Sequence, residues 1–339
     1  MTIQEVLAMP EYSFIRENEH LGDKILFLTF GGSHAYGTNK EGSDIDVRGV
    51  CLNSTDELLG IKTYEQFMDA ATDTTIYTLK KVIPLLCNCN PNTIEMLGCK
   101  PEHYAMVSPL GQLLLDNAHV FLSQRAFYSF TGYANSQLRR LQNAVARDRV
   151  TQSMREEHIR GSVQTMVNSL PDRYFNFDRS SVRLHVEDSS RPEMEKELLI
   201  DMAIKDYPAR DMNGILNEIV NVIRDYDQIG HRNNKKDDAH LNKHAMHLIR
   251  LYLTGYDLIK NKKIVTYREE DHDLLMAIRS GYYMNEDGTY KKEFFDMVDS
   301  YEEMLKKAMA ETTLPERPDY EKVNDLVVQI HKQALDTLA

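Results

Sequence analysis

The stretch from Thr29 to Val50, TFGGSHAYGTNKEGSDIDVRGV, constrains the fold of this chain more than any other. It begins in the apolar run 25–30, ILFLTF, which predicts a short buried strand, and it leads into a second predicted strand at 45–52. A third predicted strand covers 73–79, and helical patterns dominate from about residue 110. The sequence therefore predicts an α+β fold, with a small mixed β-sheet and flanking helices followed by a larger, mainly helical region.

Most of the remaining patterns predict helices. Asn92 and Glu95 fit the N-cap and N3 positions of a capping box, which alone explains both residues. Residues 197–228 predict two helices that break near Pro208. Residues 243–261, KHAMHLIRLYLTGYDLIKN, have the clearest helical pattern in the chain.

Composition excludes several classes of protein. The 339 residues are 42% hydrophobic and 27% charged, which is typical of a globular chain. No run of about 18 apolar residues is present, and the N-terminus has neither the basic start nor the apolar core of a signal peptide. We therefore expect a soluble, cytoplasmic protein that does not bind a membrane.

The net charge of −12 argues against broad, non-specific binding of nucleic acid. It leaves room for a local basic surface, and the run from residue 138 to 160 is the candidate for one that faces RNA. An ordinary solvated helix face is the alternative. The basic residues of this run are Arg139, Arg140, Arg147, Arg149, Arg155 and Arg160.

The glycines of the opening stretch do not form a P-loop. Gly32 and Gly37 have the required spacing, but the chain continues Thr38-Asn39-Lys40 instead of Lys followed by Ser or Thr. A strand is expected after them, whereas a P-loop leads into a helix.

The paired aspartates point to a metal-bound phosphate. Asp44 and Asp46 are two residues apart, so on a strand they project from the same side. Two adjacent carboxylates repel each other, and a divalent cation such as Mg²⁺, which usually takes one or two carboxylates plus substrate phosphates, removes this penalty. Each piece alone is a common turn, but their order between two strands favours a site. By alternation Arg48 lies on the same side. There it would neutralise the aspartates when no metal is bound, or it would contact the acceptor substrate.

The string Gly32-Ser33, ten residues, then Asp44-Ile45-Asp46-Val47 resembles the signature of the DNA polymerase β-like nucleotidyltransferases. Gly31-Gly32 also fits the first dipeptide. The fuller string GSHAYGTNKEGSDIDVRGV resembles one branch, the RlaP-like nucleotidyltransferases found beside RNA ligases in RNA-repair gene clusters. Residues 73–97, 243–259 and 271–281 look like the same branch.

The resemblance implies a catalytic metal site. In that superfamily the aspartate pair binds two Mg²⁺ ions, and a third acidic residue on a neighbouring strand completes the site. Asp44 and Asp46 match the pair, and Asp73 is our choice for the third, with Asp69 as an alternative. The substrate implied is a nucleoside triphosphate, with ATP expected.

The resemblance also implies residues that hold the nucleotide. Gly32 and Ser33 would bind the β- and γ-phosphates, while Thr38 and Ser43 would orient the turn.

A helix from the C-terminal half would face the triphosphate. Lys243, His247 and Arg250 follow one another at i, i+4 and i+7, on one face of the helix. A solvated helix face is the alternative explanation of this stripe.

The resemblance divides the chain into a nucleotidyltransferase-type catalytic core at 1–110, a helical region facing nucleotide and acceptor at 111–260, and a C-terminal helical region at 261–339. It implies Mg²⁺-dependent transfer of a nucleotide to a hydroxyl, with an RNA end, such as that of tRNA, as the first candidate. A protein hydroxyl, as in antitoxin-like relatives, and a non-catalytic nucleotide-binding module are the alternatives. The sequence does not name the acceptor or the oligomeric state.

Overall fold

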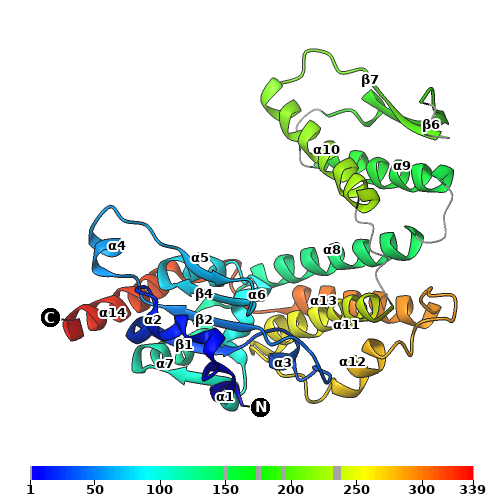
Figure 1. Ribbon diagram of the computed structural model, residues 1–339. Helices are drawn as coiled ribbons and strands as arrows, with labels where there is room; N and C mark the ends of the chain where they lie inside the picture. Colours follow the sequence, from blue (N-terminus) through cyan, green and yellow to red (C-terminus); the bar gives the residue numbers. More distant parts are fainter. Residues whose placement is uncertain are drawn as a thin grey trace. The chain divides into compact units, whose positions relative to one another are not determined.

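The chain divides into two compact units in the computed structural model, each described here by itself (Figure 1). Unit 1 comprises Met1–Arg139 and Asn242–Ala339, and unit 2 comprises Arg140–Leu241. The structure describes residues 2–147, 152–172, 174, 177–191, 196–231 and 238–338.

The N-terminal part of unit 1 alternates strands with short helices. Its elements are α1 (Ile3–Leu7), α2 (Phe14–Glu17), β1 (Ile25–Phe30), α3 (Gly32–Tyr36), β2 (Val47–Cys51), α4 (Thr55–Leu59), β3 (Gln66–Asp69), β4 (Thr74–Thr78), α5 (Leu79–Cys87), α6 (Pro91–Ile94), β5 (Tyr104–Val107) and α7 (Pro109–Asp116). Its three predicted strands are confirmed as β1, β2 and β4, and the predicted α+β class with them. Sequence patterns missed β3 and β5, which are four residues each.

The strands form one mixed sheet in the order β3-β4-β2-β1-β5. β1 pairs antiparallel with β2, whereas β2 pairs parallel with β4. The apolar run of β1 is buried at all six positions, which explains why it shows no alternation. Side chains of β1, β2 and β4 and of the first 21 residues share one hydrophobic core, which includes Ile3, Leu21, Leu28, Val47 and Ile76.

Residues 32–36 form a short helix, α3, where only a turn was expected. It ends at Gly37, which has a left-handed conformation with φ of 76°. β2 begins at Val47, two residues later than predicted, so Asp44 and Asp46 precede the strand instead of lying in it.

Long helices make up the rest of unit 1. They are the first part of α8 (Arg125–Arg147), most of α11 (Asp238–Tyr256) with a following π-helical turn (Asp257–Asn261), α12 (His272–Arg279), α13 (Lys292–Glu311) and α14 (Tyr320–Leu338). Figure 1 shows α12 next to α3, far from it in sequence. Among the described residues no helix is long and apolar enough to cross a membrane.

Unit 2 has its own hydrophobic core. It contains the end of α8, α9 (Gln152–Ser169), the hairpin of β6 (Val182–Asp188) and β7 (Lys196–Met202), and α10 (Ala209–His231). The helix predicted at the start of 197–228 is wrong, because residues 196–202 pair with β6 as a strand and bury Leu198 against the core. The helix predicted after Pro208 is confirmed as α10.

The boundaries of the two compact units, at Arg139/Arg140 and Leu241/Asn242, differ from those of the three regions expected at 1–110, 111–260 and 261–339. Contacts join the two ends of the chain into one unit, whereas the expected regions followed sequence order. That functional division stays a prediction.

Candidate active site at the acidic edge of the sheet

Asp46 and Asp73 lie side by side because of the register between β2 and β4. Parallel pairing sets Val47 opposite Thr74, so the residues just before the two strands meet at the same edge of the sheet. The backbone N–H of Val47 donates to the carbonyl oxygen of Asp73 at 3.3 Å. The carboxyl groups of Asp46 and Asp73 share a hydrogen bond. We call these two residues the acid pair.

Arg48 neutralises the acid pair. Its Nη2 lies 2.9 Å from Asp73 Oδ1 and 3.5 Å from Asp46 Oδ1. Its Nη1 donates to the carbonyl oxygen of Val47 at 3.0 Å and to that of Asp73. The side chain therefore lies on the side of Asp46 expected from alternation, although its second acidic partner is Asp73 and not Asp44.

The two acids differ in their affinity for a proton. Burial, followed by the hydrogen bond with Asp73, raises the pKa of Asp46 to about 7. The hydrogen bond from Asp46, followed by the nearby charge of Arg48, lowers the pKa of Asp73. Near neutral pH the acid pair therefore holds one proton between two carboxyl groups, as adjacent acids do when one stabilises the charge of the other.

Gly32 makes room for the carboxylate of Asp46. A Cβ atom on Gly32 would lie 1.7 Å from Asp46 Oδ2, and the residue has a left-handed φ of 52°. The neighbouring Gly31 donates its backbone N–H to the carbonyl oxygen of Asp46 at 2.8 Å. One oxygen of Asp46 therefore faces Arg48, while the other faces the backbone at the start of α3.

Asp44 lies outside the acid pair. It is exposed, in the segment before β2 begins, so strand alternation does not carry it to the side of Asp46. In the part of the chain that the structure describes, no three His, Cys, Asp or Glu side chains form a group that could hold a metal ion. The arrangement brings Asp46 together with Asp73, the predicted third ligand, and leaves Asp44, the other member of the predicted pair, outside. The alternative Asp69 instead accepts hydrogen bonds from Thr72.

Thr38 and Ser43 delimit the loop that leads from α3 toward Asp44. The Thr38 side chain is buried, and its hydroxyl has no hydrogen-bond partner among the described residues. The Ser43 hydroxyl accepts from the backbone N–H of Lys40 at 2.8 Å and from Arg279 at 3.2 Å. Ser43 thus holds the turn. Ser33 is buried at the start of α3.

Lys243 and His247 lie near this edge, on α11. Lys243 is exposed, and its charge lowers the pKa of both members of the acid pair. Burial holds the pKa of His247 well below its usual value, and the charges of Arg250, Lys243, His244 and Arg279 lower it further. The His247 ring meets the Tyr36 ring edge-on at 6.1 Å.

Arg250 does not lie with them at the surface. It is buried in an ion pair with Glu95, and its guanidinium lies 3.7 Å above the ring centre of Tyr36. The Tyr36 hydroxyl donates to the other oxygen of Glu95 at 2.8 Å. The charge of Arg250 is therefore already matched in the core by Glu95. Its role in binding phosphate stays a prediction.

The predicted capping box of Asn92 and Glu95 is also wrong. The side chain that caps α6 is Asn90, which accepts from the backbone N–H of Asn92, while Glu95 binds Arg250.

Arg279 is the site residue that sequence reasoning missed. Its Nη1 donates to the carbonyl oxygen of Thr38, and Nη2 reaches the Ser43 hydroxyl. The residue lies in the stretch 271–281 that resembles the family, but no spacing in the sequence links it to Thr38.

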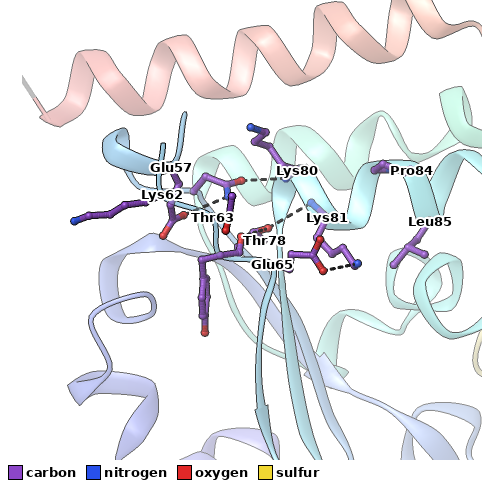
Figure 2. A pocket seen from close by; sticks show the side chains of 11 residues that line it. Glu57, Lys62, Thr63, Glu65, Thr78, Lys80, Lys81, Pro84 and Leu85 are labelled. Carbon is purple, nitrogen blue, oxygen red and sulfur yellow. Dashed lines mark hydrogen bonds and ion pairs between the residues drawn. The ribbon is translucent and has the colours of Figure 1, made fainter. Parts of the chain in front are cut away.

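A cavity of about 410 Å³ lies at the other end of β4, lined by Thr78 (Figure 2). Thr78 is five residues, or about 16 Å of strand, from Asp73 of the acid pair. Two of its lysines are already paired: Lys81 binds Glu65 at 2.6 Å, and Lys62 binds Asp56 at 2.7 Å. The acidic edge is therefore the better candidate for the chemistry.

The basic run 138–160 is described only in part. Arg149 lies outside the described residues, as do the side chains of Arg147 and Arg155. Arg139 and Arg140 are exposed, and Arg160 binds Glu157 at 2.7 Å. An RNA-facing surface here stays a prediction.

Comparison with known proteins gives one match. A family model, RlaP, described as RNA repair pathway DNA polymerase beta family, matches residues 9–329. No curated protein and no solved structure matches the chain. The resemblance drawn from residues in and around 25–100 and 240–281 is confirmed, and the match extends over the region between them.

Proposed function

The chain belongs to the RlaP family of RNA-repair, DNA polymerase β-like proteins, and from this premise we propose that it is a Mg²⁺-dependent nucleotidyltransferase that acts on RNA ends. The donor is a nucleoside triphosphate, with ATP as the first candidate, and the acceptor is the 3′-hydroxyl of an RNA such as a tRNA. The observation that carries this proposal is the acid pair, in which the Asp46 carboxyl group packs directly against the backbone of Gly32.

The donor set at the acidic edge fits a divalent cation. Asp46 and Asp73 share one proton, and a cation that binds both carboxylates takes over the role of that proton. Oxygen ligands of this kind suit Mg²⁺. Asp46 and Asp73 would hold the metal, and Asp44, the other member of the predicted pair, remains a proposed ligand of the two-ion site. When bound, Mg²⁺ makes the attacking hydroxyl more acidic and neutralises charge on the leaving pyrophosphate.

The chain's own residues supply the rest of the site. Gly32 permits close approach of a phosphate to the backbone, and Ser33 and the exposed Lys243 add a hydroxyl and a positive charge. In the reaction the acceptor hydroxyl gives up its proton, for which Asp73 is the proposed base, and its oxygen forms a bond to the α-phosphorus. The bond from that phosphorus to the bridging oxygen breaks, and pyrophosphate leaves. The protein contributes mainly by positioning the reactants and stabilising charge.

A protein hydroxyl is the second candidate acceptor. The net charge of −12 favours it, because an acidic protein attracts the RNA backbone less strongly. Donor site and chemistry would be the same, so only the acceptor distinguishes the two proposals.

One labelling assay tests both. Purified protein is incubated with Mg²⁺, each labelled nucleoside triphosphate, intact and 3′-truncated tRNA, and a cell lysate. Label on the RNA end supports the first acceptor, and label on a protein band supports the second. We expect Asp46→Asn to lower either signal by about 100-fold or more, since the metal contributes several kcal/mol. Asp23→Asn, an exposed aspartate elsewhere, is the matched control. If nothing is labelled by the wild type, the enzyme proposal fails.

A further inference from the structure

One side chain from near the C-terminus closes the loop that precedes the acid pair. Arg279, the last residue of α12, donates Nη1 to the carbonyl oxygen of Thr38 and Nη2 to the Ser43 hydroxyl at 3.2 Å. Its own carbonyl oxygen accepts from Lys40 Nζ at 3.3 Å. Thr38 and Ser43 are the first and last residues of the loop, so a single guanidinium spans it.

The loop itself is a tight turn. The backbone N–H of Ser43 donates to the carbonyl oxygen of Lys40 at 2.9 Å, and Gly42 between them has a φ of 77°. Asp44 follows Ser43 directly. Two residues later, the backbone is held again, because the carbonyl oxygen of Asp46 accepts a hydrogen bond from the N–H of Gly31. The segment 44–46 is therefore held at its start through Ser43, which binds Arg279, and at its end through Asp46, which binds Gly31.

Arginine suits this position. Its planar guanidinium reaches two acceptors with fixed geometry, which the single ammonium of lysine does not do. Within the described structure the hydrogen-bond partners of Arg279 are a carbonyl and a hydroxyl, so no carboxylate there neutralises its charge. That charge also contributes to the lowered pKa of His247, so Arg279 lies near this residue of α11.

We infer that Arg279 is a positioning residue of the acidic edge: by holding Thr38 and Ser43, it fixes the path along which residues 44–46 reach the acid pair. This inference rests on the proposed nucleotidyl transfer for its role, but not for its geometry. A displacement of about 1 Å in a reacting group lowers a rate by about 100-fold. Arg279 should thus act on the rate of transfer more than on nucleotide binding.

The test compares Arg279→Ala and Arg279→Lys with Arg317→Ala, an exposed arginine outside the site. We expect kcat to fall by about 100-fold in both Arg279 variants, with KM for the nucleotide within about threefold of wild type. Guanidinium ion should restore part of kcat in Arg279→Ala but not in Arg279→Lys. A KM that rises more than kcat falls would mean that Arg279 binds the triphosphate directly, which overturns the positioning role. Unchanged kcat with a lowered melting temperature would leave only a structural role, which also overturns it.

A second measurement needs no activity. Hydrogen exchange of the peptide covering 38–46 should be faster in Arg279→Ala than in wild type or Arg317→Ala. Unchanged exchange there contradicts the inference even if the wild type transfers nothing. Absence of transfer by the wild type contradicts the proposed function alone, so the two failures are distinguishable.

Discussion

At the scale of single residues, the site depends on how two carboxyl groups share charge. Asp46 has one oxygen on Arg48 and the other against Gly32, so it is held from both sides. Asp73, more exposed, stabilises the proton on Asp46 by accepting its hydrogen bond. Without metal the pair is therefore balanced by one proton and one arginine.

This balance predicts a pH dependence of stability. In the unfolded chain Asp46 has an ordinary pKa near 4, but in the folded protein its pKa is about 7. Stabilisation from this group is thus fully present below about pH 4 and is lost as the pH rises through about 7. Asp73, with a lowered pKa, acts in the opposite sense, and its contribution is lost only at acid pH. We expect the melting temperature of metal-free protein to fall by a few degrees between pH 6 and 8.

Thermal melts in a chelating buffer check this. Asp46→Asn should remove the fall between pH 6 and 8, while the exposed control Asp23→Asn should keep it. Equal pH slopes for wild type and Asp46→Asn would contradict the assignment of the shared proton.

Gly32 is predicted to be irreplaceable for a steric reason. Gly32→Ala adds left-handed strain of about 1–2 kcal/mol and drives a methyl group into Asp46 Oδ2. Gly22→Ala is the matched control, because Gly22 has a φ of 64° but a Cβ there meets nothing closer than 3.9 Å. We expect both variants to lose stability in urea unfolding, and only Gly32→Ala to lose transfer activity. Equal loss of activity in both would show that strain alone matters.

At the scale of elements, the acidic edge is assembled by strand register and by helices from the other end of the chain. Parallel pairing of β2 with β4 brings Asp46 to Asp73. α3 is fixed by Tyr36, which is held by Glu95 and covered by Arg250 from α11. The end of α3 is thus held by a buried ion pair.

Removal of one partner of the buried Arg250–Glu95 pair is predicted to destabilise the fold strongly. Glu95→Gln leaves a buried arginine unmatched and should cost about 3–5 kcal/mol in urea unfolding. The double variant Glu95→Gln/Arg250→Met should recover most of this loss. Asp296→Asn in the exposed pair with Lys292 is the control, with a loss of about 0.5 kcal/mol or less. Similar losses for the two single variants would mean that the Arg250 pair is not buried in solution.

At the scale of the whole molecule, the chain folds as two units with separate cores. Among the described residues, the buried members of the unit 2 core lie between Val163 and Ile219, and those of the sheet core lie between Ile3 and Ile76. The family match covers both units, so the second belongs to the protein that the family describes.

Separate cores predict two unfolding transitions in calorimetry. Leu170→Ala in unit 2 and Leu28→Ala in β1 each remove a fully buried side chain and should each cost about 2–5 kcal/mol. Each variant should shift one transition and leave the other in place. A single transition that both variants shift together would contradict independent units.

Sequence periodicity and motif spacing predicted the parts of this protein that depend on local geometry. The apolar run 25–30, the helices that became α10 and α11, and the family signature around Gly32 and Asp46 were all readable in this way. They are local because a strand or helix pattern repeats within a few residues. The hairpin strand β7 was misread because a short apolar run has no period that separates strand from helix.

Only the tertiary structure decided which of these residues meet. Arg48 joins Asp73 across 25 positions, Arg250 joins Glu95 across 155, and Arg279 joins Thr38 across 241. No periodicity spans such distances, because pairing at this range depends on strand register and on how helices pack. The sequence by itself determined the family and the acidic, glycine-rich motif. Packing decided that Asp46 pairs with Asp73, that Asp44 lies outside this pair, and that Arg279 holds the loop at Thr38 and Ser43.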